Sequence, residues 1–443
     1  MSVKFYIDTL GCAKNEYDSQ VLAADLLKKG AAMTTIPEDA DILIVNTCGF
    51  IEAAKKESID HIFAMADLKG ERKKLVVTGC LSERYHKELV QEMPEVDIFV
   101  GVNEYDDLAS ILLDGESHAT DQVHGEVEEV LPYRERVLEE NAYTAVLKIA
   151  EGCNNYCSFC AIPKIRGPYR SMKMEDCVRA AEEMANRGIK ELQIIAQDIS
   201  QYGIDLYGDR KLPELLKKLC RIDGIEWIRL FYVYDDGITD ELIDVIREEP
   251  KICEYIDMPI QHIADPVLKR MRRHSTGDSI RETVTKLRAR IPNVHIRTTL
   301  LVGFPGETEE DFEALMDFIR EFELDRVGVF AFSEEEGTPS FEMDGKLPED
   351  VKEERRDRIM ELQADISRKL NEKKIGSTFD VIIDEVLEEG LYSGRTRYDA
   401  PEIDCEVTFR AKEGYEPGMI IPVTIVNAFE YDLEGEEVSY EFA

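Results

Sequence analysis

The sequence of residues 153–160 is Cys-Asn-Asn-Tyr-Cys-Ser-Phe-Cys, which places three thiols within one short loop. Gly152 before it and the two asparagines within it favour turns and left-handed backbone conformations. Such a loop can bring Cys153, Cys157 and Cys160 around one small inorganic group. Three thiolates on a four-iron cluster leave one iron with an open coordination position, unlike the four-thiolate clusters of simple electron carriers.

Two other uses of these cysteines are open from the loop alone. Zinc usually takes four ligands, commonly as two pairs, and no fourth Cys or His lies near this loop. A disulfide would leave one thiol unused and is more typical of a secreted protein. The spacing therefore favours an iron–sulfur cluster over zinc.

The loop also resembles a known one. Its gaps of three and two residues, with the aromatic Phe159 before the last cysteine, resemble the cluster loop of the radical S-adenosylmethionine (SAM) superfamily. The resemblance implies that the three cysteines hold a 4Fe-4S cluster whose open iron chelates SAM, and that Phe159 contacts this cofactor. In that superfamily, one-electron reduction cleaves SAM to a 5′-deoxyadenosyl radical, which abstracts hydrogen from unactivated carbon.

Length and composition limit the classes of function. The 443 residues leave room for two or three domains. With 54 Lys and Arg against 92 Asp and Glu, a formal net charge of −38 disfavours a polyphosphate partner such as nucleic acid. No run of apolar residues is long enough to span a membrane, so we expect no membrane association. The start of the chain lacks a leader pattern and the chain has ten cysteines, so we expect a protein of the reducing cytoplasm.

Residues 1–118 alternate short apolar runs with helical patterns, which predicts a small α/β domain with a parallel sheet. The predicted strands are Val3–Ile7, Ile42–Val45 and Leu75–Val77, and the predicted helices are Ser19–Lys29, Glu52–Ala66 and Glu83–Glu92. A cysteine closely follows each strand: Cys12, Cys48 and Cys80. Taken singly, each is more simply a small buried apolar residue. Because the carboxyl ends of parallel strands share one edge, we expect the three to converge there.

The residues around these cysteines resemble the N-terminal domain of the methylthiotransferases. The matching segments are Leu10-Gly11-Cys12, Lys14-Asn15, Asn46-Thr47-Cys48 and Gly79-Cys80. The resemblance implies that Cys12, Cys48 and Cys80 hold a second 4Fe-4S cluster, which takes part in assembling and donating a methylthio group.

Residues 119–140 are rich in Glu and have no sustained periodicity, which predicts a linker. Residues 141–374 then repeat a strand–helix rhythm and predict an open, partial (β/α)6 barrel followed by a long helix over Glu349–Lys374. The predicted strands are Tyr143–Ile149, Glu191–Ala196, Glu226–Tyr232, Tyr255–Met258, Val294–Leu300 and Arg326–Ala331. The three-cysteine loop directly follows the first of them, at the end of the barrel where active sites lie.

Further segments of the barrel resemble methylthiotransferase motifs around the SAM site. The resemblance implies SAM contacts by residues after the second, fourth and fifth strands: Gln197, Asp198, Gln261, Gly303, Gly306 and Glu307. Arg170 in a further matching segment is a candidate for binding an anionic group. The sequence departs from the family after the third strand, where Tyr232–Asp236 lacks an expected proline. Four other cysteines match no ligand pattern and are most simply buried thiols: Cys177, Cys220, Cys253 and Cys405.

Residues 376–443 predict a small β-barrel of short strands. The predicted strands are Phe379–Ile383, Leu391–Thr396, Cys405–Phe409, Ile420–Ile425 and Glu437–Phe442. Its position resembles the TRAM domain, the substrate-recognition module of methylthiotransferases. This region has 17 Asp and Glu against four Lys and Arg, which suits a basic protein better than tRNA. The segment 397–404 resembles the branch of the family that modifies a ribosomal protein.

These resemblances imply a SAM-dependent transferase that adds a methylthio group to the β-carbon of an aspartate in ribosomal small-subunit protein twelve. Two 4Fe-4S clusters and a reducing electron donor are implied with it, and SAM serves as both methyl donor and radical source. The alternative within the family is a tRNA adenosine methylthiotransferase. An alternative of another class is an iron–sulfur electron carrier or a zinc-binding adaptor without catalysis.

Overall fold

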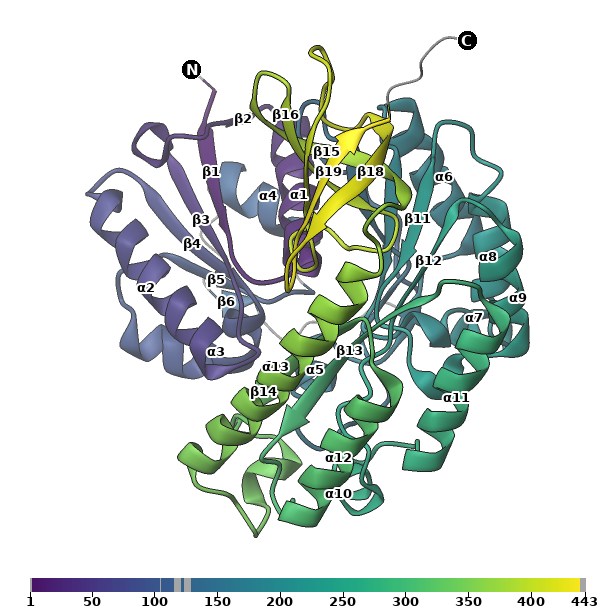
Figure 1. Cartoon of the computed structure of the whole chain (residues 1–443). Helices are drawn as coiled ribbons and strands as arrows, with labels where there is room; N and C mark the ends of the chain where they lie inside the picture. The colour runs from purple at the N-terminus through teal and green to yellow at the C-terminus, as the bar shows by residue number, and fades with distance from the viewer. Residues whose placement is uncertain (1, 104, 115–120, 123–128, 439–443) are drawn as a thin grey trace. The chain divides into compact units, whose positions relative to one another are not determined.

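The structure of the chain is a computed structural model that describes residues 2–103, 105–114, 121–122 and 129–438. The described chain forms two compact units, each built from several segments (Figure 1). The first unit comprises Met1–Glu140, Lys148–Lys173 and Ser333–Phe341, and the second comprises Asn141–Leu147, Met174–Phe332 and Glu342–Ala443. All six cysteines with predicted ligand roles belong to the first unit.

The first unit contains a parallel sheet, as predicted. Among the described residues its strand order is β2-β1-β3-β4-β5-β6, with every neighbouring pair parallel. The strands are β1 (Lys4–Thr9), β2 (Ala32–Met33), β3 (Ile42–Thr47), β4 (Lys74–Gly79), β5 (Ile98–Val100) and β6 (Asp121–Gln122). The sequence predicted β1, β3 and β4. It missed β2, β5 and β6 because two or three residues are too few for a periodic pattern. Of the predicted linker, residues 119–120 and 123–128 lie outside the described residues.

Both faces of this sheet are covered by helices. Along β3, Ile42 and Ile44 pack with the helices α1 (Ala13–Lys28) and α4 (Tyr105–Asp114). The alternate residues Leu43 and Val45 pack with α2 (Glu52–Lys69) and α3 (Cys80–Glu92) on the other face. A continuous apolar strand is the expected pattern for a sheet that is buried on both faces.

Two of these helices begin earlier than predicted. The predicted starts were Ser19 and Glu83, but α1 begins at Ala13 and α3 begins at Cys80. The polar residues that start α1 include the buried Lys14, Asn15 and Asp18, so polarity in the sequence concealed a buried first turn. The consequence is that two predicted cluster ligands lie at helix N-termini.

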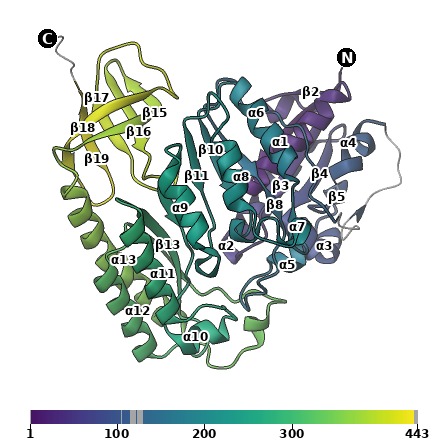
Figure 2. The same ribbon diagram turned by 90° about the vertical axis from the view of Figure 1, so that its right-hand side faces the viewer.

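The second unit contains the predicted partial barrel. In the part of the chain that is described, its strand order is β14-β13-β12-β11-β10-β7, which follows the order of the chain and does not close. The strands are β7 (Thr144–Lys148), β10 (Glu191–Ile195), β11 (Trp227–Leu230), β12 (Ile252–Asp257), β13 (His295–Val302) and β14 (Arg326–Ala331). Helices lie along one side of this sheet (Figure 2). They include α6 (Met174–Asn186), α8 (Leu212–Leu219), α9 (Asp240–Glu248), α11 (Gly277–Arg290) and α12 (Glu309–Phe322).

The long helix α13 (Glu349–Glu372) packs against β14 and leads to a closed barrel in the order β15-β16-β17-β19-β18. Its strands are β15 (Thr378–Glu388), β16 (Leu391–Thr396), β17 (Val407–Arg410), β18 (Ile420–Ala428) and β19 (Leu433–Glu437). The last described strand, β19, begins four residues before the predicted strand Glu437–Phe442 and shares only Glu437 with it. Residues 439–443 lie outside the described chain. Gly435 permits the earlier strand, since a Cβ there would lie 2.3 Å from Val423 Cγ1.

A buried ion cluster joins this barrel to the strands β10 and β11 of the partial barrel. We call Glu191, Arg229 and Arg395 the base cluster. The Glu191 carboxylate lies 2.7 Å from Arg229 Nε and 2.5 Å from Arg395 Nη2, and all three side chains are buried. Burial opposes ionisation of Glu191, but the two guanidinium groups outweigh it and hold the pKa of that carboxyl below its ordinary value. The base cluster therefore fastens β16 to the strands of the partial barrel.

Candidate metal centres

Cys12, Cys48 and Cys80 lie just beyond the carboxyl ends of three adjacent strands, as expected. Cys12 precedes the first residue of α1, and Cys80 is the first residue of α3. The positive end of a helix dipole favours a thiolate at such positions. Burial raises the pKa of Cys80 to about 11, and the nearby Cys12 and Cys48 contribute to the rise. These three thiols are therefore close enough to act on one another electrostatically.

Glycines allow the loops that carry these cysteines to approach. Gly11 has a φ of +94°, and a Cβ there would lie 2.8 Å from Cys48 Cβ. Gly79 has a φ of +97°, and a Cβ there would lie 2.4 Å from the Thr47 carbonyl oxygen. Any side chain at either position would push the strand ends apart.

Asn15 ties the three cysteine loops together. Its side-chain amide donates to the carbonyl of Leu10 at 2.8 Å and to the carbonyl of Thr47 at 3.0 Å. Its Oδ1 lies 3.7 Å from the Cys80 sulfur. Asn15 is fully buried, so a single side chain bridges the neighbourhoods of all three cysteines.

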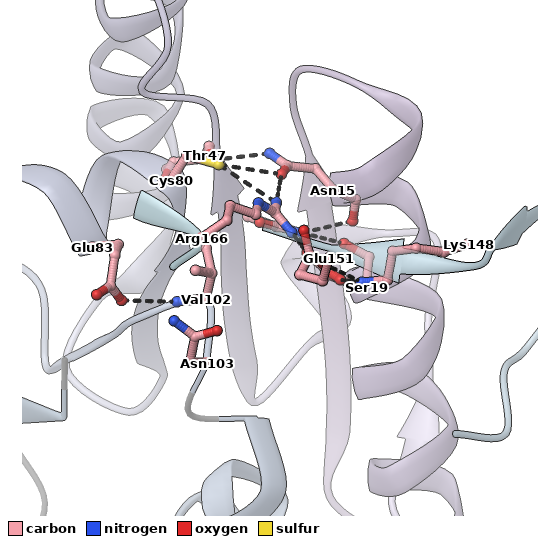
Figure 3. Close-up of polar contacts among 12 residues, drawn as sticks. Asn15, Ser19, Thr47, Cys80, Glu83, Val102, Asn103, Lys148, Glu151 and Arg166 are labelled. Atoms are coloured by element: carbon pink, nitrogen blue, oxygen red, sulfur yellow. Dashed lines mark hydrogen bonds and ion pairs between the residues drawn. The ribbon is translucent and has the colours of Figure 1, made fainter. Parts of the chain in front are cut away.

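Four buried charged side chains lie beside Cys80, and Figure 3 labels three of them: Lys148, Glu151 and Arg166. We call Asp18, Lys148, Glu151 and Arg166 the charged square. Lys148 Nζ is 2.9 Å from Asp18 Oδ1 and 2.6 Å from Glu151 Oε2. Arg166 Nη1 is 2.7 Å from Asp18 Oδ2 and 3.2 Å from Glu151 Oε2.

The other end of the Arg166 guanidinium points out of the charged square. Its Nη2 donates to Asn15 Oδ1 at 2.7 Å and to the Cys80 sulfur at 3.5 Å. The guanidinium offsets part of the burial effect that raises the Cys80 pKa. Arg166 is therefore in direct contact with a predicted ligand of the second cluster.

The loop of residues 153–160 folds back on the segment that follows it. The Cys153 N–H donates to the Gly167 carbonyl at 3.2 Å, and a Cβ on Gly152 would lie 2.0 Å from the Pro168 oxygen. Burial raises the pKa of the Cys160 thiol, and the neighbouring Cys157 and Cys153 raise it further. These thiols therefore form a second mutually interacting set.

The donor chemistry of both sets fits iron–sulfur clusters. Each set offers three sulfur atoms, the ligand type that holds such clusters. Among the described residues, no three Cys, His, Asp or Glu side chains converge closely enough to hold a single metal ion. Each thiolate of a four-iron cluster binds a different iron, so cluster ligands are spread more widely than those of one ion.

The predicted SAM contacts of the second unit lie where its strands end, and several support the local fold. Asp198 is buried, and its Oδ1 accepts the Ser200 N–H at 3.0 Å. Gln261 has a φ of +69°, a strained conformation for a residue with a side chain. The role of these residues in SAM binding stays a prediction, as does that of Phe159 in the first unit.

The predicted SAM contacts after β13 form a turn that is closed from within. Glu307 Oε2 accepts the Gly303 N–H at 2.9 Å, and Glu307 Oε1 is 2.5 Å from Arg355 Nη1. A Cβ on Gly303 would lie 2.2 Å from Lys352 Cγ, and one on Gly306 would lie 2.9 Å from Arg270 Nε. Gly303 has a φ of +73° and Gly306 a φ of +86°, so the left-handed backbone favours glycine at both positions, whatever ligand this turn binds.

The segment Tyr232–Asp236, which lacks the family's proline, is held by other means. Tyr232 has a φ of +59°, and its N–H donates to Asp257 Oδ2 at 3.1 Å. Asp235 is buried, with its Oδ1 3.4 Å from Arg273 Nη2. A strained backbone at the end of a strand, held by a carboxylate of the next strand, replaces the rigidity that a proline would give.

Three family models match successive parts of the chain. Residues 4–101 match the Uncharacterized protein family UPF0004, residues 147–319 match the Radical SAM superfamily, and residues 375–438 match the TRAM domain.

Curated relatives match over nearly the whole length of the chain. The chain is 46% identical over 447 residues to "Ribosomal protein uS12 methylthiotransferase RimO" of Clostridioides difficile (strain 630), covering 100% of both chains. It is 48% identical to the protein of the same name from Thermoanaerobacter sp. (strain X514), covering 97% of this chain and 99% of that one.

The chain belongs to the RimO family. RimO methylthiotransferases are SAM-dependent radical SAM enzymes, so the predicted family, the three-part fold and the use of SAM with 4Fe-4S clusters are confirmed.

Solved structures show the same fold at low sequence identity. The radical SAM methyltransferase TsrM from Kitasatospora setae matches with a TM-score of 0.61 and 15% identity, covering 91% of this chain and 80% of that one. The cobalamin-dependent radical SAM enzyme OxsB matches with a TM-score of 0.53 and 13% identity, covering 81% and 56%. Within the described part of the chain, no helix is both long and apolar enough to cross a membrane.

The sequence patterns did not reveal the charged square or the role of Asn15. Lys148 and Glu151 lie within the apolar run that precedes the cysteine loop, and charges in such a run signal a buried pair. Nothing in the sequence pairs them with Asp18, which is far away in the chain, or with Arg166, which lies in another loop. Arg170, predicted to bind an anion, is buried, with Nη2 3.2 Å from Asn103 Oδ1; its predicted role stays a prediction.

Proposed function

We propose that this chain places a methylthio group on the β-carbon of one aspartate of ribosomal protein uS12. The observation that carries the proposal is the presence of two separate sets of three thiols in the first unit, in a chain 44–48% identical to uS12 methylthiotransferases over nearly its whole length. One set of three thiols is expected to hold the cluster that makes the radical. The second set is expected to hold the cluster that takes part in delivering sulfur.

The proposed roles of the cysteines follow from these sets. Cys153, Cys157 and Cys160 would hold one cluster by three of its irons, which leaves the fourth iron open for SAM. Cys12, Cys48 and Cys80 would hold the other. When bound, the first cluster supplies the electron that cleaves SAM, and the second takes part in supplying the methylthio group.

Radical chemistry suits the proposed target. A hydrogen on the β-carbon of an ionised aspartate is not acidic enough for a side-chain base to remove it. Hydrogen-atom abstraction avoids that requirement, since it needs no charged carbon intermediate. The proposal therefore assigns no general base to the protein.

The charge of the C-terminal barrel supports a protein substrate. Its 17 acidic against four basic residues favour a basic partner such as a ribosomal protein, and disfavour the phosphates of tRNA. An enzyme with free thiols and iron–sulfur clusters that acts on a ribosomal protein belongs in the reducing cytoplasm, together with a reducing electron donor.

The test uses the reconstituted full-length protein with SAM, sulfide and a strong reductant. The proposal predicts that mass spectrometry finds one methylthio group on uS12 and none on tRNA, and that 5′-deoxyadenosine forms. Cys157→Ala should abolish 5′-deoxyadenosine formation, while Cys177→Ala, a change to a buried thiol of the second unit, should preserve it. Modification of tRNA in place of uS12 would contradict the proposed substrate, and absence of SAM cleavage in the wild type would contradict the proposed chemistry.

A further inference from the structure

Arg166 connects the two sets of thiols. It follows the short helix α5 (Ile162–Ile165), which begins two residues after Cys160, the last cysteine of one set. Its guanidinium contacts Cys80, a cysteine of the other set, at 3.5 Å. A residue carried by the segment that follows one predicted cluster loop thus touches a predicted ligand of the second cluster.

The charged square fixes the orientation of this guanidinium. Nη1 is held by the carboxylates of Asp18 and Glu151, so Nη2 can point only toward Asn15 and Cys80. Lys148 balances the second negative charge of the square, so the four formal charges cancel. An arginine is required here because its rigid fork presents several donors in a plane, whereas a lysine presents a single charged nitrogen.

Stability alone gives a weak account of this arrangement. Removing four charges from water is costly, and apolar residues of similar volume commonly stabilise a core as well or better. A role toward the adjacent sulfur gives the buried arginine a specific use. Hydrogen bonds and charges near ligand sulfurs are among the levers by which proteins set the potential of iron–sulfur clusters.

We propose that Arg166 is a positioning residue that raises the reduction potential of the cluster held by Cys12, Cys48 and Cys80, through its charge and its hydrogen bond to the Cys80 sulfur. The inference rests on the proposed function, which assigns a cluster to these cysteines. One-electron reduction adds a negative charge to the cluster and forms no bond. The guanidinium stabilises that added charge, so loss of Arg166 should lower the reduction potential. The Asp18 carboxylate repels the added charge, so loss of Asp18 should raise the potential.

The experiment measures the cluster of Cys12, Cys48 and Cys80 by itself. In the full-length chain, Cys153, Cys157 and Cys160 are all changed to Ala, the protein is reconstituted with iron and sulfide, and a chemical reductant supplies electrons in an EPR-monitored potentiometric titration. In this background, Arg166→Gln should lower the midpoint potential by about 59 mV, a tenfold change for a one-electron couple. Asp18→Asn should raise it, and Arg166→Lys should restore part of the loss.

Arg84→Lys is the matched control for Arg166→Lys. Arg84 is a partly buried arginine of the first unit, and its Nη1 pairs with Glu335 at 3.0 Å and donates to the Gly49 carbonyl at 2.8 Å. Its substitution should leave the potential unchanged. A potential that Arg166→Gln does not alter would overturn the inference.

If Arg166→Gln loses iron, Arg166→Lys decides the question. That variant keeps the positive charge but lacks the planar fork, so it should lower the midpoint potential by less than about 59 mV. An unchanged potential in Arg166→Lys would overturn the inference. If the background itself binds no iron, the two-cluster function fails, and the inference fails with it.

Discussion

Arg166 in the first unit and Arg229 in the second are both buried guanidinium groups that pair with carboxylates and lie near a cysteine. Arg166 donates to the sulfur of Cys80, which is one of three clustered thiols. Arg229 donates to Glu191 and to the Arg397 carbonyl oxygen. Burial and ion pairing therefore do not by themselves identify a functional arginine. The distinguishing feature is the set of thiols that surrounds Cys80.

The first prediction compares the cysteine near Arg166 with the cysteine near Arg229, and it has the largest expected effect. Cys80→Ala removes a predicted cluster ligand, so the reconstituted protein should hold about half of the wild-type iron and sulfide. Cys253→Ala changes the buried cysteine near Arg229, and this variant should hold all of the wild-type iron and sulfide. Chemical analysis of iron and sulfide measures both. Equal losses in the two variants would remove the proposed difference between the regions.

The second prediction concerns the base cluster. Glu191→Gln leaves Arg229 and Arg395 buried without their shared carboxylate, so it should destabilise the second unit by about 3–5 kcal/mol. Thermal unfolding measures this loss, while iron per folded molecule should remain at the wild-type value. Glu241→Gln, at an exposed pair with Lys217, should cost less than about 1 kcal/mol. A similar small cost for both variants would contradict the fastening role.

The third prediction tests a second ion pair of the same region. Burial disfavours the Asp399 carboxylate, but Arg326 and Lys374 outweigh it and hold the pKa of Asp399 below its ordinary value of 3.8. Because the folded-state pKa is lowered, the stabilisation is complete above about pH 4 and is lost as the pH falls toward the folded-state pKa. The advantage of the wild type over Asp399→Asn in melting temperature should therefore narrow as the pH is lowered below about 4. A constant advantage over that range would contradict the assignment.

The fourth prediction has the smallest effect. The Tyr143 hydroxyl donates to Asp384 Oδ1 at 2.7 Å, next to the base cluster. Tyr143→Phe should cost about 1 kcal/mol, the usual value of one such hydrogen bond. A loss as large as that of Glu191→Gln in the same thermal unfolding assay would show that the hydroxyl is an integral part of the base cluster.

Local patterns were enough to predict the elements that carry the chemistry. The apolar runs of β1, β3 and β4, each followed by a cysteine, indicated a parallel sheet with thiols at one edge, which the structure confirms. The strand–helix rhythm after residue 141 likewise indicated the open barrel. These features depend on residues that are close together in the sequence, so periodicity and spacing reveal them.

The features that the sequence did not reveal depend on contacts between distant residues. Arg166 and Asp18 are 148 positions apart, and Arg395 and Glu191 lie in different predicted domains. The sign of a charge does not specify its partner, so neither the charged square nor the base cluster follows from composition or spacing. The early start of α1 was missed for the same reason. Its polar first turn is buried by contacts with residues that are distant in the sequence.

The most direct test separates the two sets of thiols by their products. Full-length protein lacking Cys12, Cys48 and Cys80 is reconstituted and incubated with SAM, reductant, sulfide and uS12, beside the wild type. The account predicts that this variant still forms 5′-deoxyadenosine but adds no methylthio group to uS12, as measured by mass spectrometry, whereas the wild type does both. Methylthio transfer by the variant would contradict the assignment of sulfur delivery to these three cysteines.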